Sequence, residues 1–157
     1  MEANIEIEEE KTQAIADQLA KLLADELVLY TKTRNANLNI KGPDFDCIHL
    51  FFEEQYEELD ELMDSVAERI CMIGHYAPGT LAQLLQLSQL TDYSERENDS
   101  LGYLKELLKD HESIIAFLKG NIIAFADEYY VLGISDYITD LMETHEGMAW
   151  MIRAHLI

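Results

Sequence analysis

Apolar residues recur every three or four positions through most of the chain, which is the spacing of helices that bury one face. The first such stretch, residues 8–34, contains neither glycine nor proline. Its apolar stripe consists of Ile15, Leu19, Leu23, Leu27 and Tyr30. The same spacing returns in residues 45–73, 81–87, 100–130 and 135–156. The pattern therefore predicts four long helices and one short one.

Turn-forming residues lie between these stretches. Lys41-Gly42-Pro43 precedes Asp44, which we expect to cap the second helix. Gly74 ends that helix, Thr80 suits the N-cap of the short helix, and Gly133 separates the last two. The short helix falls inside the long link between the second and third long helices. This organisation indicates an all-α, four-helix bundle with a crossover connection.

Composition supports a single helical domain over residues 1–157, with residues 1–10 as an acidic N-terminal segment. The chain has 48% hydrophobic residues but only 7 Gly and 2 Pro, too few turn residues for a sandwich of many short strands. No apolar run reaches the roughly 18 residues of a membrane span. The acidic N-terminus does not resemble a signal peptide, and Cys47 and Cys71 do not form a disulfide framework. We therefore expect a cytoplasmic protein with reduced thiols.

The charge balance restricts the partners. The chain carries 31 acidic and 11 basic residues, for a formal net charge of −20. Its first ten residues contain no cation. Direct DNA binding is not expected because a DNA-binding protein needs basic side chains to displace counterions. An anionic membrane surface would also repel this chain, whereas multivalent cations would be attracted.

Two pairs of metal-ligand residue types lie on the predicted helix 45–73. His49 and Glu53 are four residues apart, as are Asp64 and Glu68, so each pair projects side by side and can share a metal. At about 100° per residue, Glu53, Asp64 and Glu68 lie roughly 40°, 60° and 100° around the helix from His49.

The two pairs cannot meet within one chain. His49 and Glu68 lie about 28 Å apart along a straight helix. A second copy packed antiparallel would bring Asp64 and Glu68 against the other chain's His49 and Glu53, and a two-fold axis would do so twice. The alternative is that these residues are only part of a solvated acidic face.

Three segments resemble the signature of the Dps mini-ferritins. Residues 37–56, NLNIKGPDFDCIHLFFEEQY, are similar to the family pattern H-W-N-V-x-G-x-x-F-x-x-L-H-x-x-F-[DE]-x-x-Y. Residues 64–74, DSVAERICMIG, resemble D-x-x-A-E-R-I-x-x-x-G. Residues 145–153, HEGMAWMIR, resemble H-E-K-M-A-W-M-L-R. The resemblance runs in the same order from about Thr12 to Leu156.

The resemblance implies a ferritin-like subunit of a hollow homo-dodecamer built from two-fold dimers. Such proteins oxidise Fe(II) with hydrogen peroxide or O₂, store the ferric product inside, and so protect against oxidative stress. The ferroxidase site lies between two-fold-related subunits. Carried over by position, its iron ligands are His49, Glu53, Asp64 and Glu68, with two iron positions at each site.

The sequence departs from the family pattern at two positions. Asn37 replaces the first family histidine, and Leu38 replaces the tryptophan after it. An amide oxygen is a weaker Fe(II) ligand than an imidazole. Asn37 is therefore expected either to bind the metal weakly or to contact the metal ligands without binding the metal. One iron position should be loosened, and other divalent cations are then able to substitute. The alternative is a catalytically impaired shell with a structural or interaction role.

Other residues have assignments that the resemblance suggests, each beside a plainer one. Glu54, Glu57 and Glu61 form a stripe that either nucleates ferric oxide inside a shell or is simply solvated. Asp127, Asp136 and Asp140 either line an acidic iron-entry pore or serve capping and solubility. His111 and His145 fall on apolar stripes and are interpreted as hydrogen-bonded core histidines. Trp150 is expected to pack in a core or an interface.

Overall fold

The computed structural model describes residues 7–93, 96–127 and 132–157, except for the side chains of residues 126, 127 and 132. In chain order its helices are α1 (Glu9–Asn39), α2 (Phe45–Met72), α3 (Leu81–Leu87), α4 (Ser100–Asp127) and α5 (Leu132–Ala154). The described residues contain helices and no strand. The all-α prediction is therefore confirmed.

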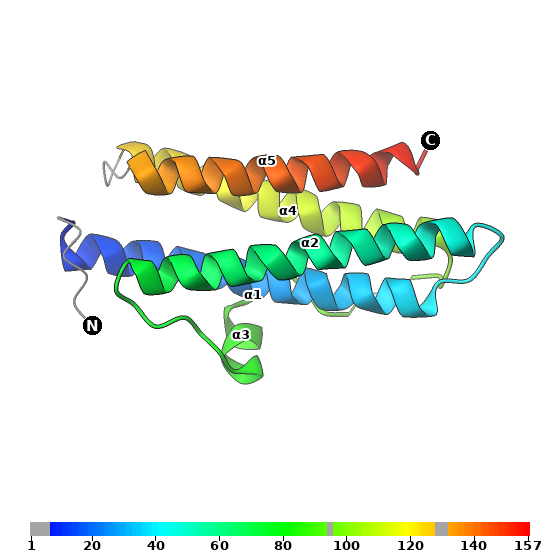
Figure 1. The fold of residues 1–157 in the computed structure, drawn as a ribbon, viewed down its shortest axis with the longest axis horizontal. Coiled ribbons are helices and arrows are strands. Elements are labelled where there is room, and N and C mark those ends of the chain that lie inside the picture. The colour runs from blue at the N-terminus through cyan, green and yellow to red at the C-terminus, as the bar shows by residue number, and fades with distance from the viewer. Residues whose placement is uncertain (1–6, 94–95, 128–131) are drawn as a thin grey trace.

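The four long helices form two hairpins. Figure 1 shows α1 beside α2 and α4 beside α5, with the two pairs stacked on each other. The short loop between α1 and α2 lies at the same end as the C-terminus, and α3 projects from the bundle near α1. The link from α2 to α4 therefore travels along the outside of the bundle, as a crossover connection does.

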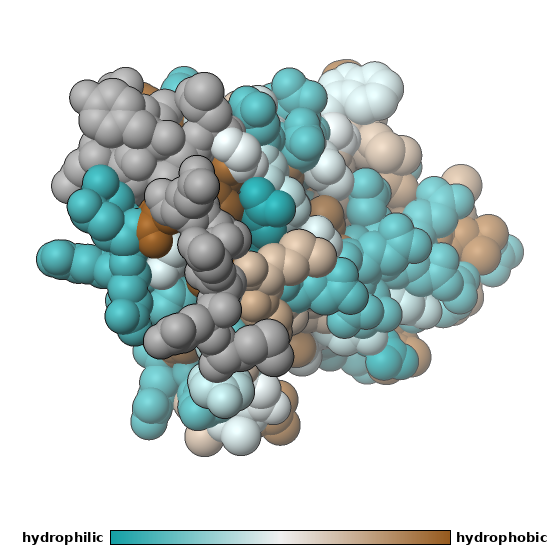
Figure 2. Space-filling model, turned by 60° about the vertical axis from the view of Figure 1, so that its left-hand side comes forward, coloured by the Kyte–Doolittle hydropathy of each residue, from teal (hydrophilic) through white to brown (hydrophobic). Residues whose placement is uncertain are grey.

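Apolar side chains from all four long helices meet along the bundle axis. Phe52 and Leu59 of α2 are fully buried, and Tyr103 of α4 and Ile138 of α5 are at most 2% exposed. Complete burial of such a side chain contributes about 1.5–3 kcal/mol relative to exposure. Hydrophilic residues cover most of the face in Figure 2, with apolar residues at separate places among them. No helix in the described ranges is both long and apolar enough to span a membrane.

The first helix is longer than the sequence pattern predicted. It continues five residues beyond the expected end at 34, to Asn39. Within this polar stretch Ala36 is fully buried, and Asn39 Nδ2 donates to the carbonyl oxygen of Asn35. Burial of Ala36 and of the next residue, Asn37, therefore packs this polar part of the helix against the bundle.

Two other helix ends differ in part from the expectation. Asp44 stands at the N-cap position of α2 but makes no capping bond, because its carboxylate accepts from the hydroxyl of Ser100 at the start of α4. Gly133 lies inside α5 instead of before it. The Gly133 carbonyl accepts a hydrogen bond from Arg69 Nη2 of α2 at 3.2 Å. Both residues connect the two hairpins.

Two predicted helix boundaries are confirmed. Thr80 and Gln83 form a capping box at α3: the Thr80 hydroxyl accepts from the Gln83 N–H, and the Gln83 side chain accepts from the Thr80 N–H, each at 3.3 Å. Gly74 follows the end of α2 with φ of 92°, a backbone conformation that favours glycine.

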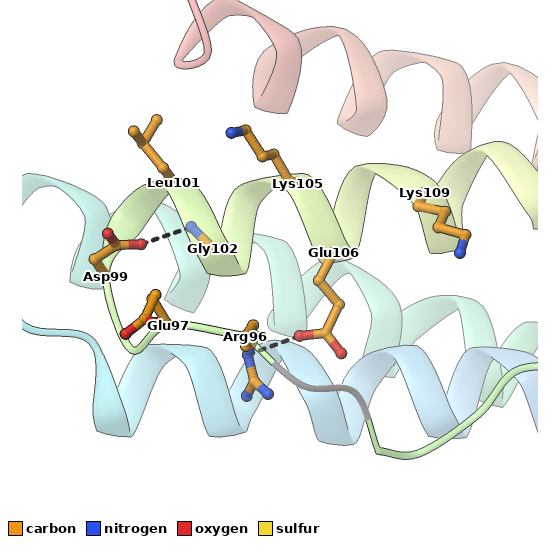
Figure 3. A pocket seen from close by; sticks show the side chains of 8 residues that line it. All are labelled: Arg96, Glu97, Asp99, Leu101, Gly102, Lys105, Glu106 and Lys109. Atoms are coloured by element: carbon orange, nitrogen blue, oxygen red, sulfur yellow. Dashed lines mark hydrogen bonds and ion pairs between the residues drawn. The ribbon is translucent and has the colours of Figure 1, made fainter.

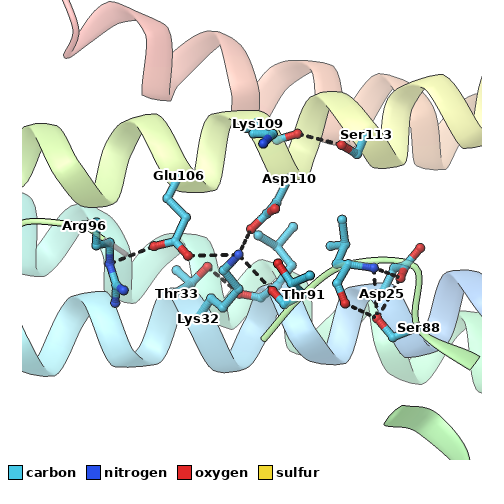
Figure 4. A network of polar contacts seen from close by, with 12 residues as sticks. Asp25, Lys32, Thr33, Ser88, Thr91, Arg96, Glu106, Lys109, Asp110 and Ser113 are labelled. Carbon is cyan, nitrogen blue, oxygen red and sulfur yellow. Dashed lines mark hydrogen bonds and ion pairs between the residues drawn. The ribbon is translucent and has the colours of Figure 1, made fainter. Parts of the chain in front are cut away.

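A buried carboxylate of α1 bonds the crossover. Asp25 is 2% exposed, and its Oδ1 accepts hydrogen bonds from Ser88 Oγ at 2.9 Å, Gln89 N at 2.6 Å and Leu90 N at 3.0 Å. Figure 4 shows this contact beside a second polar cluster around Lys32. The segment after α3 therefore has a fixed position against the bundle.

Candidate metal centre

Helix α2 carries all four proposed ligands on one side. His49 and Glu53 are half-buried near its N-terminus, and Asp64 and Glu68 are exposed farther along. Within the described part of the chain, none of the three carboxylates has a hydrogen bond or an ion pair. Carboxylates without a partner on a single helical face are available to a cation from outside the chain.

The imidazole of His49 has a defined orientation. Its Nδ1 lies 2.9 Å from the main-chain carbonyl oxygen of Asn37, and its ring stacks on Phe45 with centroids 5.2 Å apart. A carbonyl oxygen can only accept, so Nδ1 carries the proton and donates. The lone pair is consequently on Nε2, where a metal would bind, and a carbonyl behind the ring is the usual support of a ligating histidine.

Asn37 is bonded to the same residue. It is 6% exposed, and its Nδ2 donates to the main-chain carbonyl oxygen of His49 at 2.8 Å. The two residues thus join the end of α1 to the start of α2 by reciprocal hydrogen bonds. The amide nitrogen of Asn37 is used inside the chain, which leaves only its oxygen for any other partner. The neighbouring Leu38 is 69% exposed.

The two ligand pairs remain apart in the single chain. All four residues lie in one continuous helix, so the separation of about 28 Å between His49 and Glu68 applies. Among the described residues, no group of three or more His, Cys, Asp or Glu side chains is close enough to hold a metal ion. A site with more than two of these ligands therefore requires a second copy of the chain.

The model of the ferritin-like domain family matches residues 16–157, most of the chain. A DNA protection during starvation protein (Dps) from Bacillus anthracis is 34% identical over 143 residues, covering 90% of this chain and 96% of that protein. The chain belongs to the Dps family of ferritin-like proteins.

The chain is also similar to two further proteins. A low temperature-induced protein of Nostoc sp. is 35% identical over 153 residues, covering 98% of this chain and 86% of that protein. The crystal structure of a Dps protein from Vibrio cholerae superposes with a TM-score of 0.91 at 25% identity, covering 100% of this chain and 98% of the other. That structure is described as a member of the ferritin-like diiron-carboxylate proteins. Iron binding is thus the general property expected of this Dps-family chain.

The structure describes five of the six acidic side chains that were assigned to iron storage and entry. Glu54, Glu57 and Glu61 are all exposed on α2, as are Asp136 and Asp140 on α5. The side chain of Asp127 lies outside the described residues. Exposure is compatible with nucleation or a pore and equally with solvation, so these assignments stay predictions.

A surface groove near the start of α4 contains basic residues. Figure 3 shows it between α4 and the segment before it, with Lys105 and Lys109 among its lining residues. Arg96 and Glu106 point toward each other there and form an ion pair with Nε and Oε2 2.7 Å apart. Asp99 accepts from the Gly102 N–H at 2.7 Å. Arg96, Glu106 and Asp99 thus have partners among the residues of the groove itself.

The sequence interpretation did not single out the buried carboxylate of Glu26. Glu26 of α1 is 0% exposed and contacts His145 of α5, which in turn contacts His111 of α4. The prediction that both histidines are hydrogen-bonded core residues is confirmed. Glu26 could have been found because it lies seven residues after Leu19 and three before Leu29, both on the buried face. Trp150, by contrast, is 66% exposed and does not pack in the subunit core.

Proposed function

We propose that this Dps-family protein oxidises Fe(II) at sites between two-fold-related subunits and stores the ferric product inside a dodecameric shell. The orientation of His49 is the observation that carries the proposal. Its Nε2 is left free by the Nδ1 bond to Asn37, on the same helical face as unpartnered carboxylates. Imidazole and carboxylate together form a donor set that suits Fe(II).

The second copy supplies the missing half of each site. In an antiparallel arrangement of two α2 helices, His49 and Glu53 of one chain would meet Asp64 and Glu68 of the other. The site then holds one imidazole and three carboxylates, whose negative charge favours Fe(III) over Fe(II) and so promotes loss of an electron. Fe(II) and peroxide are the substrates: one peroxide takes an electron from each of two Fe(II) ions and, with two protons, leaves as two waters.

The remaining acidic residues fit the transport and deposition of iron. A net charge of −20 per chain concentrates cations near the assembled protein. Asp127, Asp136 and Asp140 would line the entry pore, and Glu54, Glu57 and Glu61 would nucleate the ferric mineral. Some relatives are named for DNA protection. The charge of this chain favours protection through iron removal instead of DNA contact.

Ferroxidase kinetics test the proposal. Ferric absorbance is followed by stopped flow after Fe(II) and peroxide are mixed with the wild type and two variants, His49→Ala and Glu68→Ala. Each variant should lose at least about tenfold in rate, because each removes a ligand from every inter-subunit site. The matched controls are His155→Ala, an exposed histidine, and Glu58→Ala, roughly 180° around α2 from His49. Both controls should keep the wild-type rate.

The alternative function is a shell of the same fold without ferroxidase activity. It predicts that His49→Ala and Glu68→Ala oxidise iron at the wild-type rate, which is then no faster than the rate without protein. That result would refute the proposed function while leaving the family membership intact.

A further inference from the structure

Three buried titratable side chains form a cluster across the bundle, away from the proposed metal site. Glu26 of α1 and His145 of α5 are 0% exposed, and His111 of α4 is 1% exposed. His145 Nε2 lies 3.5 Å from Glu26 Oε1, and the Nδ1 atoms of the two histidines lie 3.0 Å apart. The second carboxyl oxygen of Glu26 is buried and has no hydrogen-bond partner within the described residues.

The cluster connects the two hairpins near the middle of the bundle. Toward one end, Lys32 of α1 pairs with Glu106 and Asp110 of α4 at 3.0 and 2.5 Å, as Figure 4 shows. Toward the other end, Ser65 of α2 bonds the hydroxyl of Tyr137 of α5 at 2.8 Å. Along the bundle, the cluster lies between these two contacts. Their protonation thus affects the surface where the hairpins meet.

Hydrogen-bond geometry limits how many protons the cluster can hold. Between the two facing Nδ1 atoms, one imidazole must donate and the other must accept, so only one proton fits there. With three protons in total on the titrating atoms of the three groups, the cluster has no net charge. A fourth proton would leave a buried positive charge on the cluster.

The pKa directions agree with a neutral cluster. Burial lowers the pKa of His111 well below its ordinary value, and the neighbouring His145 lowers it further. Burial raises the pKa of Glu26, an effect that His145 partly offsets. Burial thus favours the neutral form of both groups: a protonated carboxyl group and an imidazole without a second proton.

The charged neighbours do not supply a compensating ion. On α1, Asp25 further raises the pKa of Glu26, while its own carboxylate accepts bonds from the crossover. On α4, Asp110 follows the same pattern: burial raises its pKa, and Lys32 is its ion-pair partner. On α5, burial raises the pKa of the Tyr137 hydroxyl, and from α2 Arg69 and Glu68 act on Tyr137 in opposite directions.

We propose that Glu26, His145 and His111 form a proton-sensitive latch that holds the two hairpins together best near pH 6.5 and opens when the core takes up a further proton. In the unfolded chain, two free histidines and one glutamate bind three protons at about pH 6.5. Below that pH the unfolded chain binds more protons than the neutral folded cluster, so stability falls with acidification. Above that pH it binds fewer, so stability falls as pH rises.

Two substitutions separate the two sides of this profile. His111→Leu leaves a neutral Glu26–His145 pair, so unfolding of this variant should take up nearly one proton fewer than unfolding of the wild type between about pH 6.5 and about pH 4.5. Its loss of stability on the acid side should be correspondingly shallower. Glu26→Gln removes the acid, so the loss of stability above about pH 6.5 that belongs to the cluster should vanish. The loss on the acid side should become steeper, because the folded cluster then holds two protons instead of three. The control His155→Gln changes an exposed histidine and should leave the profile unchanged.

The experiment measures the thermal unfolding midpoint of the full-length assembled protein from about pH 5 to about pH 8.5, as the difference between each variant and the wild type. Profiles for His111→Leu and Glu26→Gln that parallel the wild type at every pH would refute the latch. If either variant fails to fold, hydrogen–deuterium exchange at the imidazole C2 position of the wild type decides by mass spectrometry. His111 should titrate well below pH 6.5, and titration at or above that value would also refute the proposal.

Discussion

His49 and Asn37 show how two residues twelve positions apart define the corner where α1 meets α2. Each main-chain carbonyl accepts from the other residue's side chain, at 2.9 and 2.8 Å. The sequence suggested that Asn37 weakens a metal ligand set. The structure adds that its amide nitrogen holds His49 in place, a role that residue type alone does not reveal because an amide can donate or accept.

Replacing Asn37 by histidine tests the cost of the lost imidazole. Asn37→His should raise the rate of Fe(II) oxidation, roughly tenfold, because an imidazole at this corner adds a ligand beside His49. Asn37→Ala is the matched variant: it removes the bond to the His49 carbonyl and adds no ligand, so its rate should fall below the wild type. The measurement is stopped-flow ferric absorbance with peroxide. Equal rates for the wild type and Asn37→His would show that position 37 does not reach the metal.

At the scale of the helices, the apolar spacing was sufficient to predict their number, their order and their approximate positions. It was insufficient to predict contacts at helix ends whose partner residue is distant in the sequence. Ser100 takes the carboxylate of Asp44 that was expected to cap α2, and Arg69 bonds the carbonyl of Gly133 inside α5. The spacing could have shown that Glu26 is buried, but only the folded bundle brings His145 next to it.

The attachment of the crossover to α1 predicts a large effect of one substitution. Asp25→Ala removes the acceptor of four hydrogen bonds, two of them from backbone N–H groups. The free energy of unfolding should fall by at least about 2 kcal/mol, because bonds to a charged acceptor are lost and buried donors stay unsatisfied. Asp60→Ala, at an exposed position of α2, is the control and should change it by no more than about 0.5 kcal/mol. Denaturant titration of both variants measures the difference, and equal values would contradict this role of Asp25.

For the whole molecule, the charge determines what we expect of contact with DNA. A net charge of −20 leaves few cations for contact with phosphates. We expect no gel shift of duplex DNA at neutral pH and about 0.1 M salt in the absence of divalent metal. A tight complex under those conditions would contradict the prediction. A shift only after Mg²⁺ is added would indicate metal bridging between two polyanions.

Anomalous diffraction at the iron absorption edge, from crystals soaked anaerobically in Fe(II), tests the inter-subunit centre most directly. The account predicts a strong peak within coordination distance of His49 Nε2 and Glu53 of one chain and of Asp64 and Glu68 of its two-fold partner. A second position near Asn37 should be weaker. Crystals of His49→Ala should lose the strong peak. Iron peaks that avoid the two-fold interface, or that are unchanged in His49→Ala, would contradict the account.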